Sequence, residues 1–302
     1  NFWAALGAAH SGKIPDLRRI EAVGDVDVEG SGEILRITST PSVGARTIVQ
    51  NPQGLIVDEI FQSLPTPYVV TRTGYMPGKV ALTFDDGPWP VNTPAVLKAL
   101  ADECTKGLFF SVGKHATYHP EILRQVLAQG HTVGAHTWSH VNLAGKKMTE
   151  QQARDEIEKG FSAVKWALGT NPSPFFRFPQ LQHNPAIVTY FGTRNVAMFS
   201  TDVDSFDFRK GATPEKIVET VMTKLDKLGK GIILMHDFQK RTGEALPTLL
   251  ARLKAGGYKV VAMRAKAPVA SLPEYDQELM KDVKLPTVST RPVNSVVTTV
   301  SE

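Results

Sequence analysis

From Lys79 onward, short apolar stretches alternate with amphipathic ones, and this alternation limits what the chain can fold into. The apolar stretches have the length of strands and lie at residues 79–84, 108–112, 131–136, 175–178, 195–201, 231–236 and 258–263. Strands separated by helices pair in parallel, and the helices form the crossovers. No sequence repeat underlies the pattern. We therefore expect an α/β fold of about seven parallel strands, arranged as a barrel or an open sheet.

The stretches between these strands carry start and stop signals for helices. Ser or Thr before a proline predicts a cap followed by a first-turn proline, and a glycine predicts the end of a helix. Two helices are expected to begin at Thr93-Pro94 and at Thr213-Pro214. A third begins at a capping box of Thr149 with Gln152 and runs to Ala167. Two more are expected from Pro120 to Gln129 and from Gly243 to Ala255.

The two ends of the chain differ in texture from this central part. Residues 1–75 have short β-like runs, such as 33–38 and 54–57, which Pro, Gly and acidic residues interrupt. We expect them to form a small β-containing leader or accessory segment. The main domain is expected at residues 76–266 and a C-terminal extension at 267–302, with a short helix near 274–281 and an extended tail from 285.

Composition excludes several classes of protein. The chain has 302 residues, and its 34 Lys and Arg against 30 Asp and Glu form no basic block, which argues against a nucleic-acid partner. No apolar run reaches the length of a membrane span. Cys104 is the only cysteine, which excludes an intrachain disulfide and a thiolate metal cluster. The chain starts with Asn, and no targeting segment is visible in it.

Two adjacent carboxylates, Asp85 and Asp86, end the first of the apolar strands, and Gly87-Pro88 then turns the backbone. The carboxyl ends of parallel strands are where α/β proteins place their chemistry. Successive side chains of a strand point to opposite sides, so one aspartate can bind a metal while the other handles a proton. The alternative is a simple β-turn that uses Asp-Gly.

Two histidines, His136 and His140, follow the third strand at a spacing of four residues. Side chains at this spacing share a face of a helical turn and can bind one cation together. His115 and His119 have the same spacing, but there we expect only a polar loop before Pro120. A His–His–Asp set with open positions is what a hydrolytic metal site requires.

Arg177 lies in the aromatic run that forms the fourth strand. An arginine is costly to bury unless its guanidinium meets a carboxylate, and Asp85 is the obvious partner. The alternative is that Arg177 reaches the surface along its apolar stem.

His236 ends the apolar strand at 231–236, and three carboxylates lie within residues 202–207. His236 is a candidate proton donor, with a carboxylate such as Asp207 raising its pKa. The alternative is a structural histidine at the edge of the core.

Five segments of this chain resemble, in order, the motifs of the polysaccharide deacetylase family. This is the NodB homology group, or carbohydrate esterase family 4, which includes chitin and peptidoglycan N-acetylglucosamine deacetylases. The likeness spans about residues 76–265, and the segments are Thr83–Pro88, His136–His140, Arg177–Pro179, Asp204–Phe208 and Leu234–His236. The resemblance implies a distorted (β/α) barrel of about seven strands, an N-acetylated glycan as partner, and an extracellular, periplasmic or cell-envelope location.

The resemblance also implies a role for each matching residue. One divalent ion, Zn²⁺ or alternatively Co, Ni or Mn, would be held by Asp86, His136 and His140. Asp85 would be the general base held by Arg177, and His236 the general acid supported by Asp207. The substrate would be contacted by the Gln180 backbone amide, by Leu234 and Phe208 around the acetyl methyl, and by Trp89.

Two positions depart from the family pattern. Gln180-Leu181 stands where the motif usually continues with Tyr-Gly, and Phe208 stands where Trp is usual. A backbone amide survives a change of side chain if the turn is kept, so we expect an N-deacetylase. An O-deacetylase of an acetylated glycan and a carbohydrate-binding protein without turnover are the alternatives. The sequence leaves the glycan, the position attacked and the oligomeric state open.

Overall fold

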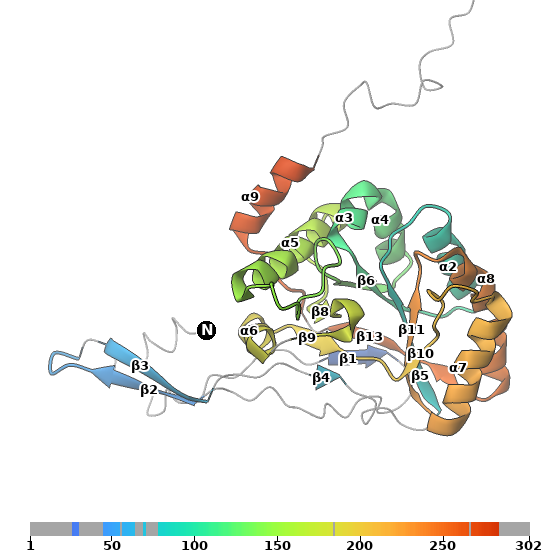
Figure 1. The fold of residues 1–302 in the computed structure, drawn as a ribbon, viewed down its shortest axis with the longest axis horizontal. Coiled ribbons are helices and arrows are strands. Elements are labelled where there is room, and N and C mark those ends of the chain that lie inside the picture. The colour runs from blue at the N-terminus through green and yellow to red at the C-terminus, as the bar shows by residue number, and fades with distance from the viewer. Residues whose placement is uncertain are drawn as a thin grey trace, which may run out of the picture.

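The computed structural model of the chain describes residues 26–29, 45–54, 56–63, 69–70, 78–183, 185–265 and 267–283. Its centre is a parallel sheet that curls into a half-barrel, with helices around it (Figure 1). The strands that follow the main pattern are β5 (Lys79–Asp85), β6 (Leu108–Ser111), β7 (Thr132–Ala135), β8 (Phe175–Phe176), β9 (Ala197–Phe199), β10 (Val203–Asp204) and β11 (Gly231–His236). These seven parallel strands confirm the expected fold class.

The strand order is β10-β11-β5-β6-β7-β8-β9, and a short strand β4 (Val69–Val70) adds to β9. Within the described residues β10 and β4 do not pair, so the barrel is open between them. Strand β12 (Lys259–Val260) pairs with the first residues of β5, whereas β6 pairs with its last residues, from Thr83. The apolar stretch expected as one strand at 258–263 is thus divided between β12 and β13 (Ala262–Ala265).

The helices cover the outside of the sheet (Figure 1). They are α2 (Asn92–Asp102), α3 (Gly113–Tyr118), α4 (Pro120–Ala128), α5 (Glu150–Leu168), α6 (Pro185–Arg194), α7 (Pro214–Leu228), α8 (Lys240–Ala255) and α9 (Pro273–Asp282), with a 3₁₀ turn η2 at Pro179–Leu181. The capping box of Thr149 with Gln152 is confirmed at the start of α5. Thr213 caps α7, and Gly229 ends it in the left-handed conformation.

The local predictions for Thr93 and His115 were wrong. Thr93 does not cap α2, which begins one residue earlier, because the Thr93 hydroxyl instead donates a hydrogen bond to Asp237 at 2.6 Å. His115 lies in helix α3 and not in a polar loop. Both differences arise from contacts with distant segments, which a local sequence pattern does not reveal.

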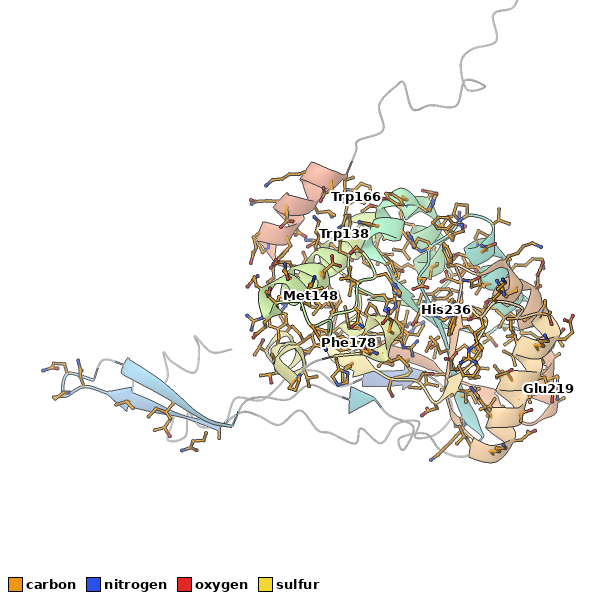
Figure 2. The ribbon with its side chains drawn as sticks, viewed as in Figure 1. Trp138, Met148, Trp166, Phe178, Glu219 and His236 are labelled. Carbon is orange, nitrogen blue, oxygen red and sulfur yellow. The ribbon has the colours of Figure 1, made fainter. Side chains whose placement is uncertain are left out.

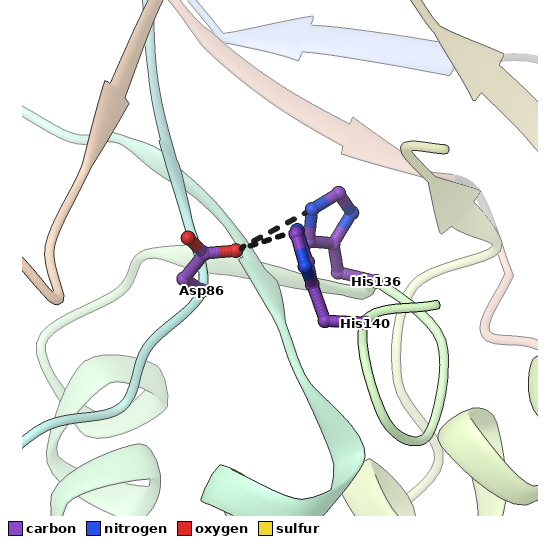
Figure 3. Close-up of side chains that lie close together, drawn as sticks. All are labelled: Asp86, His136 and His140. Atoms are coloured by element: carbon purple, nitrogen blue, oxygen red, sulfur yellow. Dashed lines mark ion pairs between the residues drawn. The ribbon is translucent and has the colours of Figure 1, made fainter. Parts of the chain in front are cut away.

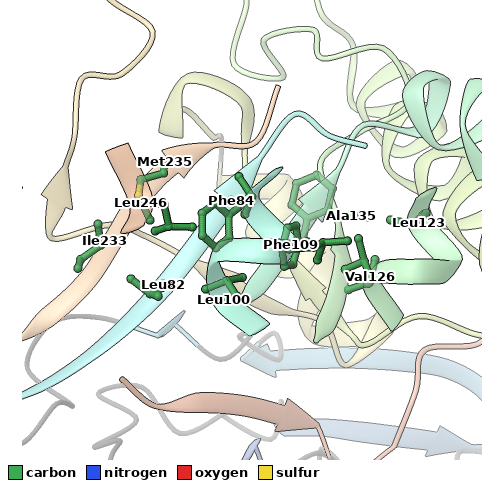
Figure 4. Close-up of a cluster of buried hydrophobic side chains, with 14 of the residues drawn as sticks. Leu82, Phe84, Leu100, Phe109, Leu123, Val126, Ala135, Ile233, Met235 and Leu246 are labelled. Carbon is green, nitrogen blue, oxygen red and sulfur yellow. The ribbon is translucent and has the colours of Figure 1, made fainter. Parts of the chain in front are cut away.

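The core lies between the sheet and its helices (Figure 4). Leu82 and Phe84 of β5 are fully buried, as are Phe109 of β6 and Leu246 of α8. The Phe84 and Phe109 rings stack with centroids 4.9 Å apart. Because β5 is central and covered on both faces, it has no alternation of polar and apolar residues. Its first polar side chains after Thr83 are therefore the two carboxylates at its end.

The register between β11 and β5 positions the site. Six residue pairs connect these strands, from Gly231 opposite Val80 to His236 opposite Asp85. A histidine and an aspartate that are 151 positions apart in the chain therefore end neighbouring strands at the same edge of the sheet. No pattern within either segment specifies this neighbourhood.

Segments outside the main pattern also contribute strands. β1 (Val26–Glu29) pairs antiparallel with β13, and β2 (Ala45–Gln50) forms a hairpin with β3 (Ile56–Ser63). The β-like run expected at 54–57 overlaps the start of β3, while the run at 33–38 and the tail from 285 lie outside the described residues. In the part of the chain that the structure describes, no helix combines the length and apolarity that crossing a membrane would require.

Candidate metal and active site

Asp86, His136 and His140 converge at the carboxyl edge of the sheet (Figure 3). Asp86 Oδ1 lies 3.5 Å from His136 Nε2 and 3.3 Å from His140 Nε2. One ligand atom from each residue lies within 4.8 Å of the other two. Asp86 Oδ1 is buried and accepts no hydrogen bond from any residue that the structure describes. A buried carboxylate oxygen without a partner, facing two imidazole nitrogens, fits a divalent cation with a two-histidine, one-carboxylate ligand set.

The tautomer of His136 is set by the hydrogen bond that its Nδ1 makes. His136 Nδ1 lies 2.6 Å from the carbonyl oxygen of Arg177, which can only accept, so Nδ1 carries the proton and Nε2 is left for a metal. Burial lowers the pKa of His136, and this outweighs the opposing effect of Asp85 and Asp86. The imidazole is therefore neutral at pH 7, as metal binding requires.

The residues of the candidate metal site are held in unusual backbone conformations, and His136 and His140 lie in a loop and not on the helical turn that their spacing suggested. Asp86 has φ 76°, and the loop that carries His140 has positive φ at Thr137 and at His140 itself. Non-glycine residues in this region are strained and cluster at functional sites. His115 Nδ1 donates to the Asp86 carbonyl at 2.6 Å, and the Gly87 amide donates to Asp237 Oδ1 at 3.0 Å. These two hydrogen bonds hold the turn that presents Asp86.

Asp85 and Arg177 form a buried ion pair. Arg177 Nη1 donates to Asp85 Oδ1 at 2.8 Å and to the Thr83 hydroxyl at 2.7 Å, and its Nη2 donates to the Ser200 carbonyl at 2.9 Å. The Arg177 side chain is fully buried, with its guanidinium 4.5 Å from the centre of the Phe110 ring. The surface alternative for Arg177 was therefore wrong. Asp85 Oδ2 lies 3.8 Å from His136 Nε2, next to the metal-binding residues.

His236 is bound to Asp207 at two points. Its Nδ1 lies 2.6 Å from Asp207 Oδ1, and its backbone amide donates to Oδ2 at 2.7 Å. The Thr242 hydroxyl donates to the same Oδ2 at 2.5 Å, so the fully buried Asp207 is held firmly. Burial alone would lower the pKa of His236, but the hydrogen bond and charge of Asp207, with Asp86 and Asp85, raise it to about 9. His236, labelled in Figure 2, is therefore protonated at pH 7.

The four residues expected to contact a substrate lie in different surroundings. Gln180 is exposed and has φ 56°, and Leu181 after it also has positive φ. Leu234 is buried on β11, two residues before His236. Phe208 is half exposed, and its ring lies edge-on to His236 with centroids 5.4 Å apart. Trp89 is half buried, and its ring contacts the rings of His115, His119 and Phe238.

Three residues at this site were not predicted from the sequence. Asp237 is buried under the Asp86 turn, and burial raises its pKa to about 7 although Thr93 and the Gly87 amide oppose this. His115 contacts the Asp86 carbonyl, as described above. Glu156 of α5 accepts hydrogen bonds from the Ser139 amide and hydroxyl at 2.9 and 2.8 Å. The only available signal was the position of Asp237 directly after His236.

The chain was compared with known proteins. The sequence model of the polysaccharide deacetylase family matches residues 74–196. A peptidoglycan-N-acetylglucosamine deacetylase of Bacillus cereus is 32% identical over 206 residues, which cover 66% of this chain and 92% of the relative. The chitooligosaccharide deacetylase of Sinorhizobium fredii is 30% identical over 204 residues, 63% of this chain and 92% of that protein.

Peptidoglycan-N-acetylglucosamine deacetylase PgdA of Listeria monocytogenes is 32% identical over 185 residues. That match covers 61% of this chain but only 38% of the Listeria protein, so the chain spans well under half of that relative. Among solved structures, the peptidoglycan deacetylase Bd3279 of Bdellovibrio bacteriovorus aligns with a TM-score of 0.59 and 33% identity, over 64% of this chain and 54% of that one. The chain belongs to the polysaccharide deacetylase family.

Proposed function

We propose that the chain hydrolyses the N-acetyl group of N-acetylglucosamine residues in a polysaccharide or oligosaccharide and releases acetate. The observation that carries this proposal is the convergence of Asp86, His136 and His140 beside the Asp85–Arg177 pair and the Asp207–His236 pair. The relatives named above act on peptidoglycan or chitooligosaccharides, in keeping with this substrate class. The domain that carries the activity is proposed to span residues 76–266, in the extracellular space or cell envelope.

The metal fits the residues present. Asp86, His136 and His140 would hold a divalent ion, which we propose to be Zn²⁺ because two imidazoles and one carboxylate are a common catalytic zinc set. When bound, such an ion acts as a Lewis acid on the acetyl carbonyl oxygen and lowers the pKa of a coordinated water.

The remaining steps belong to the side chains around it. Asp85 takes the proton of the attacking water, and Arg177 orients this carboxylate through the hydrogen bond from its Nη1. The backbone amide of Gln180 donates to the oxyanion that forms on the acetyl carbonyl. His236, protonated through its contact with Asp207, gives its proton to the departing amine. Leu234 and Phe208 offer apolar contacts for the acetyl methyl, and Trp89 contacts the glycan.

The substitution Asp85→Asn tests this proposal. We expect it to abolish acetate release from N-acetylglucosamine oligomers, because the amide cannot accept the proton of the water. Since Asp85 is not one of the metal-binding residues, metal content should stay near one ion per chain, as measured by elemental analysis of the same sample. Undiminished acetate release from this variant would refute the assignment of the base.

A substrate panel decides between the proposed N-deacetylase activity and the two alternatives, an O-deacetylase and a carbohydrate-binding protein. N-acetylated and O-acetylated glycans are compared for acetate release, with and without a chelator. Release from N-acetylated oligomers that the chelator abolishes supports the proposal. Release only from O-acetylated glycans would instead assign an esterase, and binding without any release would assign a carbohydrate-binding role.

A further inference from the structure

A pocket of about 220 Å³ lies between the β10–α7 loop and the first turns of α7. Its cationic lining comes from Arg209, Lys210 and Lys216, and its apolar lining from Phe206 and Ile217; we call it the basic pocket. β10 pairs with β11, so this loop leaves the sheet at the same edge as His236. The rings of Phe206 and Phe208 have centroids 6.3 Å apart, and Phe208 in turn contacts His236.

The positive charges of the basic pocket have no counter-charge. Arg209, Lys210 and Lys216 are exposed, and no carboxylate in the described part of the chain forms an ion pair with any of them. Lys216 Nζ donates to the Gly211 carbonyl at 3.3 Å. On α8, by contrast, the exposed Arg252 forms an ion pair with Glu219 of α7 at 3.0 Å.

The loop presents Arg209 in a defined way. Its guanidinium lies 3.7 Å from the centre of the Phe206 ring, and the ammonium group of Lys224 lies 3.9 Å from the same ring. Lys224 also donates to the Asp204 carbonyl at 2.6 Å. Phe206 has φ 55°, a strained conformation held by its amide hydrogen bond to Asp204 Oδ1 at 2.8 Å. Stacking on the ring leaves the guanidinium N–H groups, which no described residue accepts, for a ligand.

Among the described residues, none of the nearby carboxylates forms an ion pair with Arg209, Lys210 or Lys216. Asp204 Oδ1 accepts from the Phe206 amide, and Asp207 is buried against His236. Glu215, in the first turn of α7, is exposed and forms no ion pair with another described residue. Cations that repel one another beside an active site are the arrangement that an anionic ligand stabilises, because it removes the repulsion and fills the donors.

We propose that the basic pocket binds a carboxylate carried by the glycan, close to the sugar that is deacetylated. The planar fork of Arg209 matches a carboxylate in geometry, and Lys210 and Lys216 add charge. This inference rests on the proposed function and deepens it, since it assigns the substrate class. A glycan that bears carboxylates, such as peptidoglycan with its lactyl and peptide acids, fits the pocket, whereas uncharged chitin leaves it empty.

Kinetics with two oligosaccharides test the specificity. The double variant Arg209→Gln, Lys210→Gln is compared with Lys254→Gln, whose lysine lies beside Lys79 at the opposite edge of the sheet. For a carboxylate-bearing peptidoglycan oligosaccharide we expect the double variant to raise KM about tenfold with kcat unchanged. KM for a chitin oligomer of equal length should not change, and Lys254→Gln should leave both values as in the wild type. An equal rise of KM for both substrates, or no rise, overturns the proposal.

A binding measurement separates this inference from the proposed activity. Sedimentation with insoluble peptidoglycan, freed of phosphate-containing polymers, is compared with the same material after its carboxylates are converted to amides. We expect the wild type to bind the unmodified material about tenfold more tightly at low salt, and the double variant to bind both equally. Equal binding by the wild type overturns the basic pocket even if acetate is released. If the wild type shows the expected difference in binding but releases no acetate, the role of the basic pocket is supported and only the proposed deacetylase activity is refuted.

Discussion

Asp85 and Asp86 are adjacent in the chain but lie in different surroundings. Asp85 faces Arg177 at the end of the buried strand β5, whereas Asp86, at φ 76°, faces His136 and His140. Because the chain bends between them, one carboxylate is paired with a guanidinium and the other keeps an oxygen without a hydrogen-bond partner. Environment, and not residue type, separates the proposed base from the proposed metal ligand.

The pH dependence of the reaction should report the contact of His236 with Asp207. The pKa of His236 is raised above its usual 6.5, so the proton donor is present below the raised value and is lost as pH rises through it. A cation bound to Asp86 offsets part of that rise, so the alkaline limb of kcat should lie between 6.5 and about 9.

In Asp207→Asn the alkaline limb should move toward 6.5, by one pH unit or more, because the charge that favours imidazolium is gone. The matched control is Asp226→Asn, an exposed carboxylate near the end of α7. An alkaline limb that does not move in Asp207→Asn would show that another group supplies the proton.

Glu156 should act on metal binding without touching the metal. Its carboxylate accepts from the Ser139 amide and hydroxyl and so holds the loop that carries His140. Glu156→Gln should weaken zinc binding about 10- to 100-fold, measured by competition with a chromophoric chelator. Glu150→Gln removes an exposed carboxylate from the first turn of the same helix and should leave zinc affinity unchanged. If Glu156→Gln binds zinc as tightly as the wild type, the contact of Glu156 with Ser139 does not contribute to zinc binding.

At the scale of elements, α5 packs against the loop that carries His140 of the candidate metal site. The Trp138 amide donates to the Glu156 carbonyl at 2.8 Å, and Gly160, one turn further along α5, lies directly against Thr137. On the other side, α9 packs on α5, where Lys159 reaches Glu278 at 3.1 Å and Asp282 at 2.5 Å. The loop is thus held by a helix that is itself covered by the C-terminal extension.

Because Gly160 lies so close to Thr137, replacing this glycine with alanine should lower the free energy of unfolding and not raise it. In an exposed helix, Gly→Ala stabilises by about 1 kcal/mol. In Gly160→Ala, however, the added Cβ would lie 2.7 Å from the Thr137 carbonyl carbon, so the backbone of the loop that carries His140 must move. We expect a loss of about 1–3 kcal/mol in the free energy of unfolding, by urea denaturation, together with weaker zinc binding. A higher free energy of unfolding in Gly160→Ala would show that the loop can move away from α5 without cost.

At the scale of the whole molecule, the candidate site joins segments that are distant in the chain. Asp86 follows β5, and His136 and His140 follow β7, with β6 and three helices between them in sequence. Parts of the chain before residue 76 also join the fold, since β4 pairs with β9 and β1 pairs with β13. A ligand at the site therefore binds the assembled fold and not any single segment.

Metal binding should for this reason raise the thermal stability. At a free zinc concentration of about 100 times Kd, linkage adds about 2.7 kcal/mol to the free energy of unfolding. For a domain of this size that corresponds to a rise in Tm of roughly 5–10 °C, measured by scanning calorimetry with and without chelator. In Asp86→Ala the rise should vanish. The same rise in that variant would place the zinc at another site.

The sequence by itself determined most of the strands and helices after Lys79 and the residues at the strand ends, but it did not indicate helix α6. The period of apolar residues indicated the strands, and caps such as Thr149 and Thr213 marked the helices, because these signals depend on near neighbours. Carboxylates and imidazoles at strand ends were visible for the same reason. A strand of two residues, such as β8 or β10, leaves too short a pattern to be bounded in this way.

Only the tertiary structure decided which of these ends meet. That β11 lies beside β5 brings His236 next to Asp85, and this follows from pairing between segments 150 residues apart. The same distance separates Asp237 from the Asp86 turn that it supports, and burial decided whether Arg177 pairs inside or reaches the surface. Such contacts arise from register and packing across the whole sheet, which no local stretch of residues encodes.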